Sequence, residues 1–471
     1  MLQRTGASFR PMLWLVATGV FMQMLDTTIV NTALPAMAAS LGESPLRMQA
    51  VVISYALTVA MLIPASGWLS DRLGTRRVFI AAVALFTLGS LACAGSRRLN
   101  ELVVARVLQG IGGAMLLPVG RLAVLRVVPR ADFLAAMSFV TLPGLIGPLV
   151  GPTLGGWLVQ AASWHWIFLI NLPLGVAGTV AAFRWMPDLR QTVPGFDLLG
   201  YGLLAFGMVA VSLSLDLLSD RRPRHGVVLV LLVFGLASLA AYWLHAARTT
   251  RPLFPLALFK VHTFSVGLLG NLFSRIGSSG MPYLIPLLMQ VAMRYSPMHA
   301  GMMMTPAAAA GMFSKRIVVP LVRRLGYRRL LVGNTLLVGT TMATFALVRP
   351  GQALWLHAVQ FACFGFVNSL QFTAMNTLAL RDLTGEVASA GNSLLSMVMM
   401  LAMSLGVAVA GGLLGAFGGV AVDLEPTRTF GAFRWTFVCV GLVTMASAAI
   451  FAQLEPTHHI PHATVQEADP A

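Results

Sequence analysis

Acidic residues are scarce in this chain. Only 16 of its 471 residues are Asp or Glu, and all charged residues together make up 10% of the sequence. Soluble domains carry about 25% charged residues. Because 57% of the residues are hydrophobic, the chain cannot cover itself with water-facing side chains. The composition excludes a soluble globular protein and places most of the chain inside a lipid bilayer.

Cysteines and common catalytic motifs are equally sparse. The three cysteines fall within apolar runs and form no CxxC pair: Cys93, Cys363 and Cys439. This spacing indicates neither a disulfide framework nor a thiolate metal site. No GxxxxGK[ST], HExxH or GxSxG pattern occurs, so the sequence favours neither nucleotide hydrolysis nor an enzyme. His458, His459 and His462 are better explained by a solvated tail than by a metal site, and we expect no metal and no cofactor.

The excess of positive charge, +16 at pH 7, does not indicate a nucleic-acid partner. Lys and Arg stand singly or in pairs at the ends of apolar runs and form no continuous basic face. Of the 32, 20 fall in loops on the side of the two termini and 10 on the opposite side, and the remaining two, Arg106 and Arg275, lie inside apolar runs. Arg221, Arg222 and Arg224, on the opposite side, are the exception to the bias. Since Lys and Arg collect in cytoplasmic loops, both termini are predicted to be cytoplasmic.

Apolar stretches near 20 residues long, enough to cross the hydrocarbon core, recur along the whole chain. They predict fourteen membrane spans: 12–34, 50–69, 77–95, 101–121, 135–158, 164–186, 198–218, 226–246, 263–286, 300–320, 329–348, 352–376, 390–416 and 431–453.

An internal repeat organises these spans. The loop at 71–77 reads DRLGTRR, and 252 residues later the loop at 323–329 reads RRLGYRR, identical at five of seven positions. The offset predicts two parallel six-helix halves, one of the known transporter plans. The expected parts are an N-terminal bundle at 1–190, an inserted helix pair at 191–260, and a C-terminal bundle with a short cytoplasmic tail at 261–471.

Asp26 is the only carboxylate well inside a predicted span. A carboxylate at the bilayer centre costs roughly 2.5–3.5 kcal/mol on insertion scales, so it must face a cavity or a partner. Either Asp26 loads and releases a proton, or it bonds to neighbouring helices and fixes their register. The sequence favours proton coupling.

Four motifs now point to a family. They are LDTTIVNTALP at 25–35, GWLSDRLGTRR at 67–77, RVLQGIGG at 106–113 and GPLVGPTLGG at 147–156. Each resembles a motif of the fourteen-helix drug:proton antiporters of the major facilitator superfamily, and the resemblance covers the whole chain. It implies an all-α polytopic membrane protein with two six-helix bundles plus two inserted helices, which exports by alternating access.

Arg106 and Gln109 are the expected neighbours of Asp26. Arg106 lies about 8 Å into the fourth span, Asp26 lies about 12 Å from the outer end of the first, and Gln109 comes level with Asp26. The family fold lines a central cavity with these two spans, so the three residues are expected to share a polar site in its outer half. By the resemblance Arg106 takes part in proton transfer; the alternative is a structural counter-ion.

Arg275 is a further charge, about 20 Å into the ninth span. The 252-residue offset maps Asp26 onto Ser278, so the second half lacks the acid and proton carriage is assigned to the first half. Arg275 is expected to contact an anionic substrate, to neutralise Asp26 across the cavity, or to serve structure. With Gln109 and Asn31, Arg275 and Ser278 are the candidate cavity residues.

The loop after the second span carries the candidate gate. Gly67 and Gly74 permit a tight turn, Asp71 is expected to interact with the N-terminal dipole of the next helix, and the basic residues hold the loop in the cytoplasm: Arg72, Arg76 and Arg77. The resemblance implies a gating latch. In the second copy Arg323 replaces Asp71, which makes a latch there doubtful.

In the fifth span Gly147, Gly151 and Gly155 recur every four residues and share one face, as close helix approach requires. Pro148 and Pro152 each remove a backbone hydrogen bond and favour a bend. With Gly156, this segment is expected to act as a hinge and seal; the alternative is ordinary small-residue packing.

These observations predict a proton-coupled exporter of small molecules in a bacterial inner membrane, with multidrug efflux as its function. Its partners are the substrate, protons and the bilayer, and it is expected to work as a monomer. The alternative is a proton-coupled exporter of a specific metabolite such as an organic anion.

Overall fold

The computed structural model describes residues 9–191, 195–218, 225–383, 385–418 and 426–455, and all regular structure within them is helical. The tail histidines at 458, 459 and 462 and the three arginines at 221–224 lie outside the described residues.

The first half contains five long helices and a sixth that starts with a short turn. Its elements are α1 (Arg10–Leu41), η1 (Pro45–Met48), α2 (Gln49–Leu73), α3 (Thr75–Gly95), α4 (Leu99–Val127), α5 (Arg130–Ala161), α6 (Trp166–Leu169) and α7 (Asn171–Trp185). Two further helices follow, α8 (Leu198–Leu218) and α9 (His225–Arg248), and the short η2 (Leu256–Lys260) leads out of them.

The second half repeats the plan with more interruptions. Its elements are α10 (His262–Ser278), α11 (Met281–Leu287), η3 (Leu288–Ala292), α12 (Pro297–Thr344), η4 (Phe345–Leu347), α13 (Leu354–Leu380), α14 (Gly385–Gly418), α15 (Pro426–Ala446) and α16 (Ala448–Phe451).

Eleven helical segments among the described residues are long and apolar enough to cross a membrane. One of them, Pro297–Leu347, holds two of the predicted spans, which meet at Gly326, where the backbone leaves the helical conformation at φ 73°. The predicted twelfth span is α13, and the predicted ninth is α10 continued by α11. Every one of the fourteen predicted spans therefore has a helical counterpart in the described structure.

The ninth span differs from its prediction as one uninterrupted helix over 263–286. α10 ends at Ser278 and α11 begins at Met281. Gly280 lies against α14, where a Cβ would come within 2.6 Å of the Ala410 Cβ and 3.0 Å of the Gly406 carbonyl oxygen. Close backbone approach at this point explains the small residues at the break.

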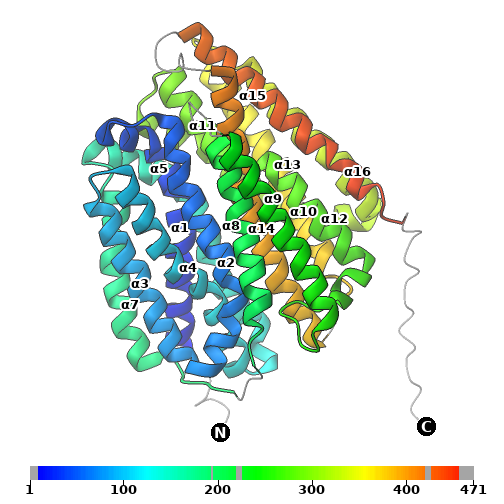
Figure 1. The fold of residues 1–471 in the computed structure, drawn as a ribbon. Coiled ribbons are helices and arrows are strands. Elements are labelled where there is room, and N and C mark those ends of the chain that lie inside the picture. The colour runs from blue at the N-terminus through cyan, green and yellow to red at the C-terminus, as the bar shows by residue number, and fades with distance from the viewer. Residues whose placement is uncertain (1–8, 192–194, 219–224, 384, 419–425, 456–471) are drawn as a thin grey trace, which may run out of the picture.

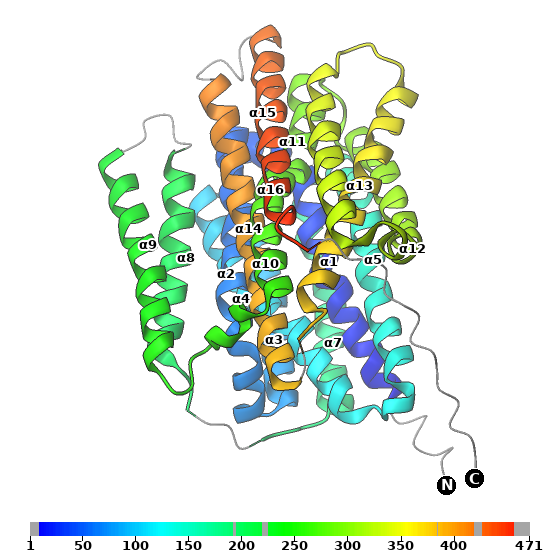
Figure 2. The ribbon, with the colours of Figure 1, turned by 90° about the vertical axis from the view of Figure 1, so that its right-hand side faces the viewer.

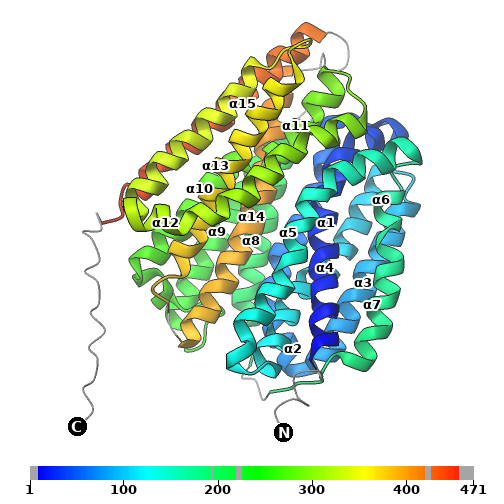
Figure 3. The same ribbon diagram turned by 180° about the vertical axis from the view of Figure 1, so that it is seen from behind.

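The two halves lie side by side, with α1–α7 in one and α10–α16 in the other (Figures 1 and 3). We call the face where α1 begins and α2 meets α3 the inner face, and the opposite one, where α1 ends, the outer face. One apolar cluster near the outer face draws on both halves, with Val30, Leu34 and Ile167 from the first and Tyr283 and Phe437 from the second. The buried residues of a second cluster, around Phe79 and Phe86, come from the first half, and Met400 of α14 packs against it.

Hydrogen bonds also join the halves near the outer face. Thr153 on α5 bonds to Thr305 on α12 at 3.0 Å, Gln290 Nε2 donates to the Thr32 carbonyl at 2.8 Å, and the Tyr283 hydroxyl donates to the Leu46 carbonyl at 3.4 Å. Figure 3 shows α5 and α12 together at their outer ends and apart toward the inner face. The two halves are therefore joined on the outer side and diverge toward the inner face, an arrangement that we call inward-facing.

The extra pair packs on α2 and α14 through α8, and α9 lies on the side of α8 away from them (Figure 2). Asp197 anchors its inner end: the carboxylate accepts hydrogen bonds from Gly200 N at 2.9 Å, Leu253 N at 3.0 Å and His245 Nε2 at 2.8 Å. Burial alone would raise the pKa of Asp197, but these hydrogen bonds outweigh it and hold the pKa below the ordinary value.

Candidate proton-coupling site

Three polar side chains, which we call the triad, meet inside the first half: Asp26 from α1, and Arg106 and Gln109 from α4. Arg106 Nη1 donates to Asp26 Oδ2 and to Gln109 Oε1, both at 2.6 Å. Gln109 Nε2 donates to Asp26 Oδ1 at 2.8 Å. Asp26 and Gln109 are 0% exposed and Arg106 is 1% exposed. Both carboxylate oxygens are occupied, and one guanidinium balances the buried charge.

Residues of α2 and α3 complete the triad. Arg106 Nε donates to the Val51 carbonyl at 3.2 Å, and its guanidinium lies over the Tyr55 ring at 4.2 Å from the centroid. Gln109 Nε2 also donates to Ser90 Oγ at 2.8 Å. The sequence did not single out Val51, Tyr55 or Ser90, since each is an ordinary residue of an apolar span and only the packing of α2, α3 and α4 brings it here.

The triad differs in one respect from its prediction as a site lining the central cavity. Its hydrogen bonds and ring contacts come from the first half, and the rings of Tyr55 and Phe168 cover the Arg106 guanidinium. The Asp26 carboxylate is bonded to Arg106 and Gln109 and does not face an open cavity. A proton can therefore reach Asp26 only if these helices shift.

Small residues permit this close packing. A Cβ on Gly89 of α3 would lie 2.5 Å from the Gln109 backbone nitrogen, and a Cβ on Gly113 of α4 would lie 2.5 Å from the Tyr55 hydroxyl. Gly89 and Gly113 thus let the Arg106 helix pack closely against α3 and α2.

The glycines of α5 press on the same stretch of α1. A Cβ on Gly147 would lie 2.9 Å from Leu25 N, one on Gly155 would lie 2.8 Å from the Ile29 carbonyl oxygen, and one on Gly151 would overlap Thr28 Oγ1. The predicted shared face is confirmed, and it packs on both sides of Asp26 along α1. Pro148 and Pro152 lie inside α5, which continues through them as a helix.

The outer end of α5 also crosses into the second half. A Cβ on Gly156 would overlap the Pro297 carbonyl oxygen on α12, and one on Gly301 of α12 would overlap the Pro152 carbonyl oxygen on α5. Backbone-to-backbone contact of this kind seals the outer face between the two helices.

The loop motif is arranged differently from its prediction. Gly67 lies inside α2, where a Cβ would meet no other atom within 4 Å, so it forms no turn; the turn is made by Gly74, whose φ is +96°. Asp71 lies in the last turn of α2 and pairs with Arg126 of α4 at 2.6 Å, while α3 has no side-chain cap. The carboxylate therefore ties α2 to α4 instead of interacting with the start of α3.

The loop's other residues tie it to the segment that leads toward α8. Arg76 Nε donates to the Met186 carbonyl at 2.5 Å, and Thr75 Oγ1 donates to the Pro187 carbonyl at 2.6 Å. The Arg72 guanidinium lies over the Trp68 ring at 5.0 Å. Arg77 is exposed.

Arg275 does not neutralise Asp26 in this arrangement, because Asp26 is already paired with Arg106. Arg275 Nε donates to Asn271 Oδ1 at 3.1 Å, and its guanidinium lies 3.8 Å from the centroid of the Phe372 ring. Within the described residues no carboxylate pairs with it. This half-buried cation therefore keeps donor capacity for another acceptor.

Two other candidates form bonds within their own helices. Asn31 Nδ2 donates to the Thr27 carbonyl at 3.2 Å, and Ser278 Oγ donates to the Ser274 carbonyl at 3.0 Å. Neither is bonded to the triad.

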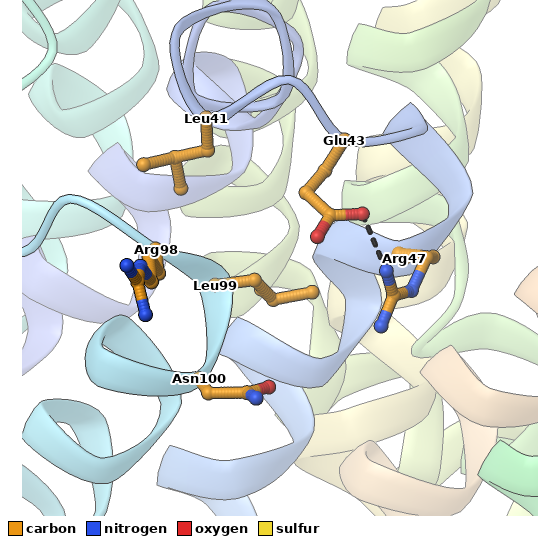
Figure 4. Close-up of a pocket in the computed structure, with 6 residues that line it drawn as sticks. All are labelled: Leu41, Glu43, Arg47, Arg98, Leu99 and Asn100. Carbon is orange, nitrogen blue, oxygen red and sulfur yellow. Dashed lines mark hydrogen bonds and ion pairs between the residues drawn. The ribbon is translucent and has the colours of Figure 1, made fainter.

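A surface depression of about 310 Å³ lies elsewhere, at the outer ends of α1, α2 and α4. Figure 4 shows its lining: Leu41, Glu43, Arg47, Arg98, Leu99 and Asn100. Glu43 and Arg47 are paired with each other at 2.5 Å, and none of the triad residues lines it. We assign no transport role to this depression.

Comparison with known proteins identifies the family. The model of the Major Facilitator Superfamily matches residues 16–197 and 268–470. The chain belongs to this superfamily. The match leaves out most of the segment that contains α8 and α9.

Curated relatives are similar in sequence to this chain along almost its full length. A protein of Serratia proteamaculans (strain 568) called putative multidrug resistance protein MdtD is 53% identical over 454 residues, covering 96% of this chain and 95% of that protein. A protein of Cronobacter sakazakii with the same name is 54% identical over 442 residues, covering 94% of each.

Solved structures share the superfamily fold at low identity. A POT family transporter in complex with 5-aminolevulinic acid has a TM-score of 0.69 at 15% identity, covering 93% of this chain and 94% of that chain. A bacterial homolog of the human lysosomal transporter Spinster, in an inward-facing and unoccupied conformation, has a TM-score of 0.65 at 15% identity, covering 94% and 95%.

Proposed function

We propose that this chain is a proton-coupled multidrug exporter, a drug:proton antiporter that works by alternating access. The observation that carries the proposal is the triad, in which a fully buried carboxylate is balanced by a single guanidinium. The names of the relatives, putative multidrug resistance proteins, support small-molecule export.

The triad links protonation to helix packing. A proton that binds the Asp26 carboxylate removes the negative charge and so breaks the ion pair with Arg106. The freed guanidinium also contacts α2, through the Val51 carbonyl and the Tyr55 ring. Binding or loss of one proton therefore changes how α1 and α4 are held against α2.

Contacts through α5 extend this link to the second half. Gly147 and Gly151 pack on the α1 backbone and side chains next to Asp26, and Gly156 of the same helix packs on Pro297 of α12. A shift of α1 at Asp26 is thereby passed to the helix that closes the outer face.

The inward-facing arrangement with a formed ion pair corresponds to the step after proton release to the cytoplasm. In the cycle we propose, a proton enters from outside and neutralises Asp26, the transporter turns inward, the proton leaves, and substrate binds. One charge moving through 100 mV releases about 2.3 kcal/mol, before any pH gradient is added.

We further propose that the inner face is cytoplasmic, that the membrane is the bacterial inner membrane, and that one chain is the working unit. The bias of Lys and Arg supports the orientation. The energy source is the proton gradient, without a cofactor or covalent chemistry.

The experiment that tests the proposal is efflux of ethidium from cells that express the chain. We expect efflux that a protonophore abolishes and that Asp26→Asn abolishes at equal protein level. Efflux unaffected by the protonophore would reject proton coupling, and no efflux of ethidium or any other cationic dye would reject the multidrug assignment.

Arg275 supports a second candidate, a proton-coupled exporter of an organic anion. Its guanidinium lies inside a span and has no carboxylate partner among the described residues. Competition distinguishes the two functions: chemically unrelated cationic dyes compete for a multidrug site, whereas only carboxylate-bearing compounds compete for the anion site. Arg275→Gln should weaken anion competition and leave dye efflux in place.

A further inference from the structure

One inserted helix, α8, bonds to both halves of the transporter at the outer side. Its neighbours are α2 of the first half and α14 of the second, which also pack on each other. Figures 1 and 2 show α8 beside this pair of helices. An apolar cluster fills the part of this three-helix contact that lies toward the inner face. Its members include Leu57 from α2, Leu204 and Met208 from α8, and Met397 and Val398 from α14.

Two polar contacts lie between that cluster and the outer face, one helical turn apart on α8. Ser212 Oγ and Ser404 Oγ of α14 are hydrogen-bonded at 2.7 Å, and both residues are 0% exposed. Gln49 Nε2, at the outer start of α2, donates to Asp216 Oδ1 at 2.9 Å. One face of α8 is thus fastened to the second half through Ser212 and to the first half through Asp216.

Gln49 is held between the two sides. Its side chain is 4% exposed, and on the side away from Asp216 it contacts α14, where a Cβ on Gly411 would overlap Gln49 Oε1. The glycine leaves room for the amide between α2 and α14. The link sits at the outer face, where the halves must part when the transporter opens outward.

We propose that Asp216 and Gln49 form a latch that holds the outer face closed through the inserted helix. If α2 and α14 separate at their outer ends, α8 can follow only one of them. The Ser212 bond lies nearer the outer face than Leu57 of α2, and with the contacts to Met397 and Val398 it holds α8 on α14. The Gln49 to Asp216 bond is therefore the one that breaks. The latch requires alternating access, and so rests on that part of the proposed function, but it requires no particular substrate and no proton.

The test measures the two faces directly. Spin labels are placed at Asn100 and Ala353 across the outer face and at Leu73 and Leu325 across the inner face, in a background without the three native cysteines. Double electron–electron resonance then gives the ratio of outer-open to outer-closed molecules. Because a hydrogen bond to a charged group is among the stronger ones, Gln49→Ala should raise that ratio about tenfold.

Three comparisons separate the latch from general loosening. Asp216→Asn keeps an acceptor for Gln49 and should shift the ratio much less than Asp216→Ala. In the Asp216→Ala background, Gln49→Ala should add less than about twofold, as expected for partners in one interaction. Ser214→Ala is the control, because Ser214 is buried on the same helix and its hydroxyl donates to the Val211 carbonyl of that helix.

The proposal is overturned if Gln49→Ala changes the ratio by less than about threefold, or if its effect persists undiminished with Asp216→Ala. If Asp216→Ala fails to fold, Gln49→Ala against Ser214→Ala decides the matter. Since the readout needs neither substrate nor pH gradient, a failed latch and a failed assignment of proton-coupled export are distinguishable.

Discussion

Removing Arg106 is the sharpest test of the triad as a buried ion pair. Arg106→Met deletes two hydrogen bonds of 2.6 Å, one to Asp26 and one to Gln109, together with the bond to the Val51 carbonyl and the contact with the Tyr55 ring. Asp26 remains 0% exposed in the parent fold, with only the Gln109 amide as a partner.

The expected cost follows from the charge left behind. Breaking a buried pair by removing one partner costs about 3–5 kcal/mol, whereas replacing both partners by apolar residues is often neutral. We therefore expect Arg106→Met to lower the free energy of unfolding by about 3–5 kcal/mol. Adding Asp26→Leu should restore most of it, because the orphaned carboxylate is then gone.

Equilibrium unfolding of the purified variants in mixed detergent micelles measures these differences as a double-mutant cycle. The double variant should be folded and yet unable to couple export to a proton gradient, which separates stability from function. A double variant whose loss equals the sum of the two single losses would show that Asp26 and Arg106 do not interact, and would refute the reasoning.

Three further predictions concern the packing around this site. Gly151→Val should reduce transport strongly, because the added side chain collides with Thr28 on α1; uptake by inside-out vesicles at the parental rate would contradict it. Asp71→Asn should cost at most about 1 kcal/mol of stability, since its pair with Arg126 is partly exposed, but should slow transport in proteoliposomes; an unchanged rate would exclude a gating role. Folding lowers the pKa of Asp197, so its carboxylate stabilises the fold above the unfolded pKa and this contribution is lost as pH falls through the lowered value. Thermal unfolding should therefore show a deficit for Asp197→Asn at pH 7 that shrinks below about pH 4, and a deficit independent of pH would disprove the linkage.

The sequence predicted the triad because charge inside a membrane is costly and therefore conspicuous. Asp26 and Arg106 stand out from apolar spans, and Gln109 follows from helical depth. The depth of a residue in its span does not say which spans are neighbours. That the first and fourth spans lie together came from the family resemblance. Tyr55 and Ser90 were missed for the same reason: a hydroxyl in a span has no distinguishing signal until its neighbours are known.

The inserted pair shows a different limit. Asp216 lies close to the end of its predicted span, so in the sequence it looks like an ordinary residue of the membrane interface. Its importance lies in the bond to Gln49, 167 residues away in sequence. No periodicity or composition reports such a contact, because it depends on where α8 docks.

Glycine patterns predicted helix packing correctly but did not predict which glycine forms a turn. The four-residue repeat of α5 predicted a packing face, and the structure places that face against α1. Gly67 and Gly74 looked alike as turn residues, but only Gly74 has a positive φ. At the ninth span, the run from Gly277 to Gly280 was the available signal for the break between α10 and α11.

Proton coupling through Asp26 is the central claim, and inside-out vesicles carrying wild type or Asp26→Asn test it most directly. The measurement is ethidium uptake with and without an imposed proton gradient. We predict that the gradient accelerates uptake by the wild type, whereas the variant retains only the slow, gradient-independent exchange. Gradient-driven uptake by Asp26→Asn at the wild-type rate would contradict the account.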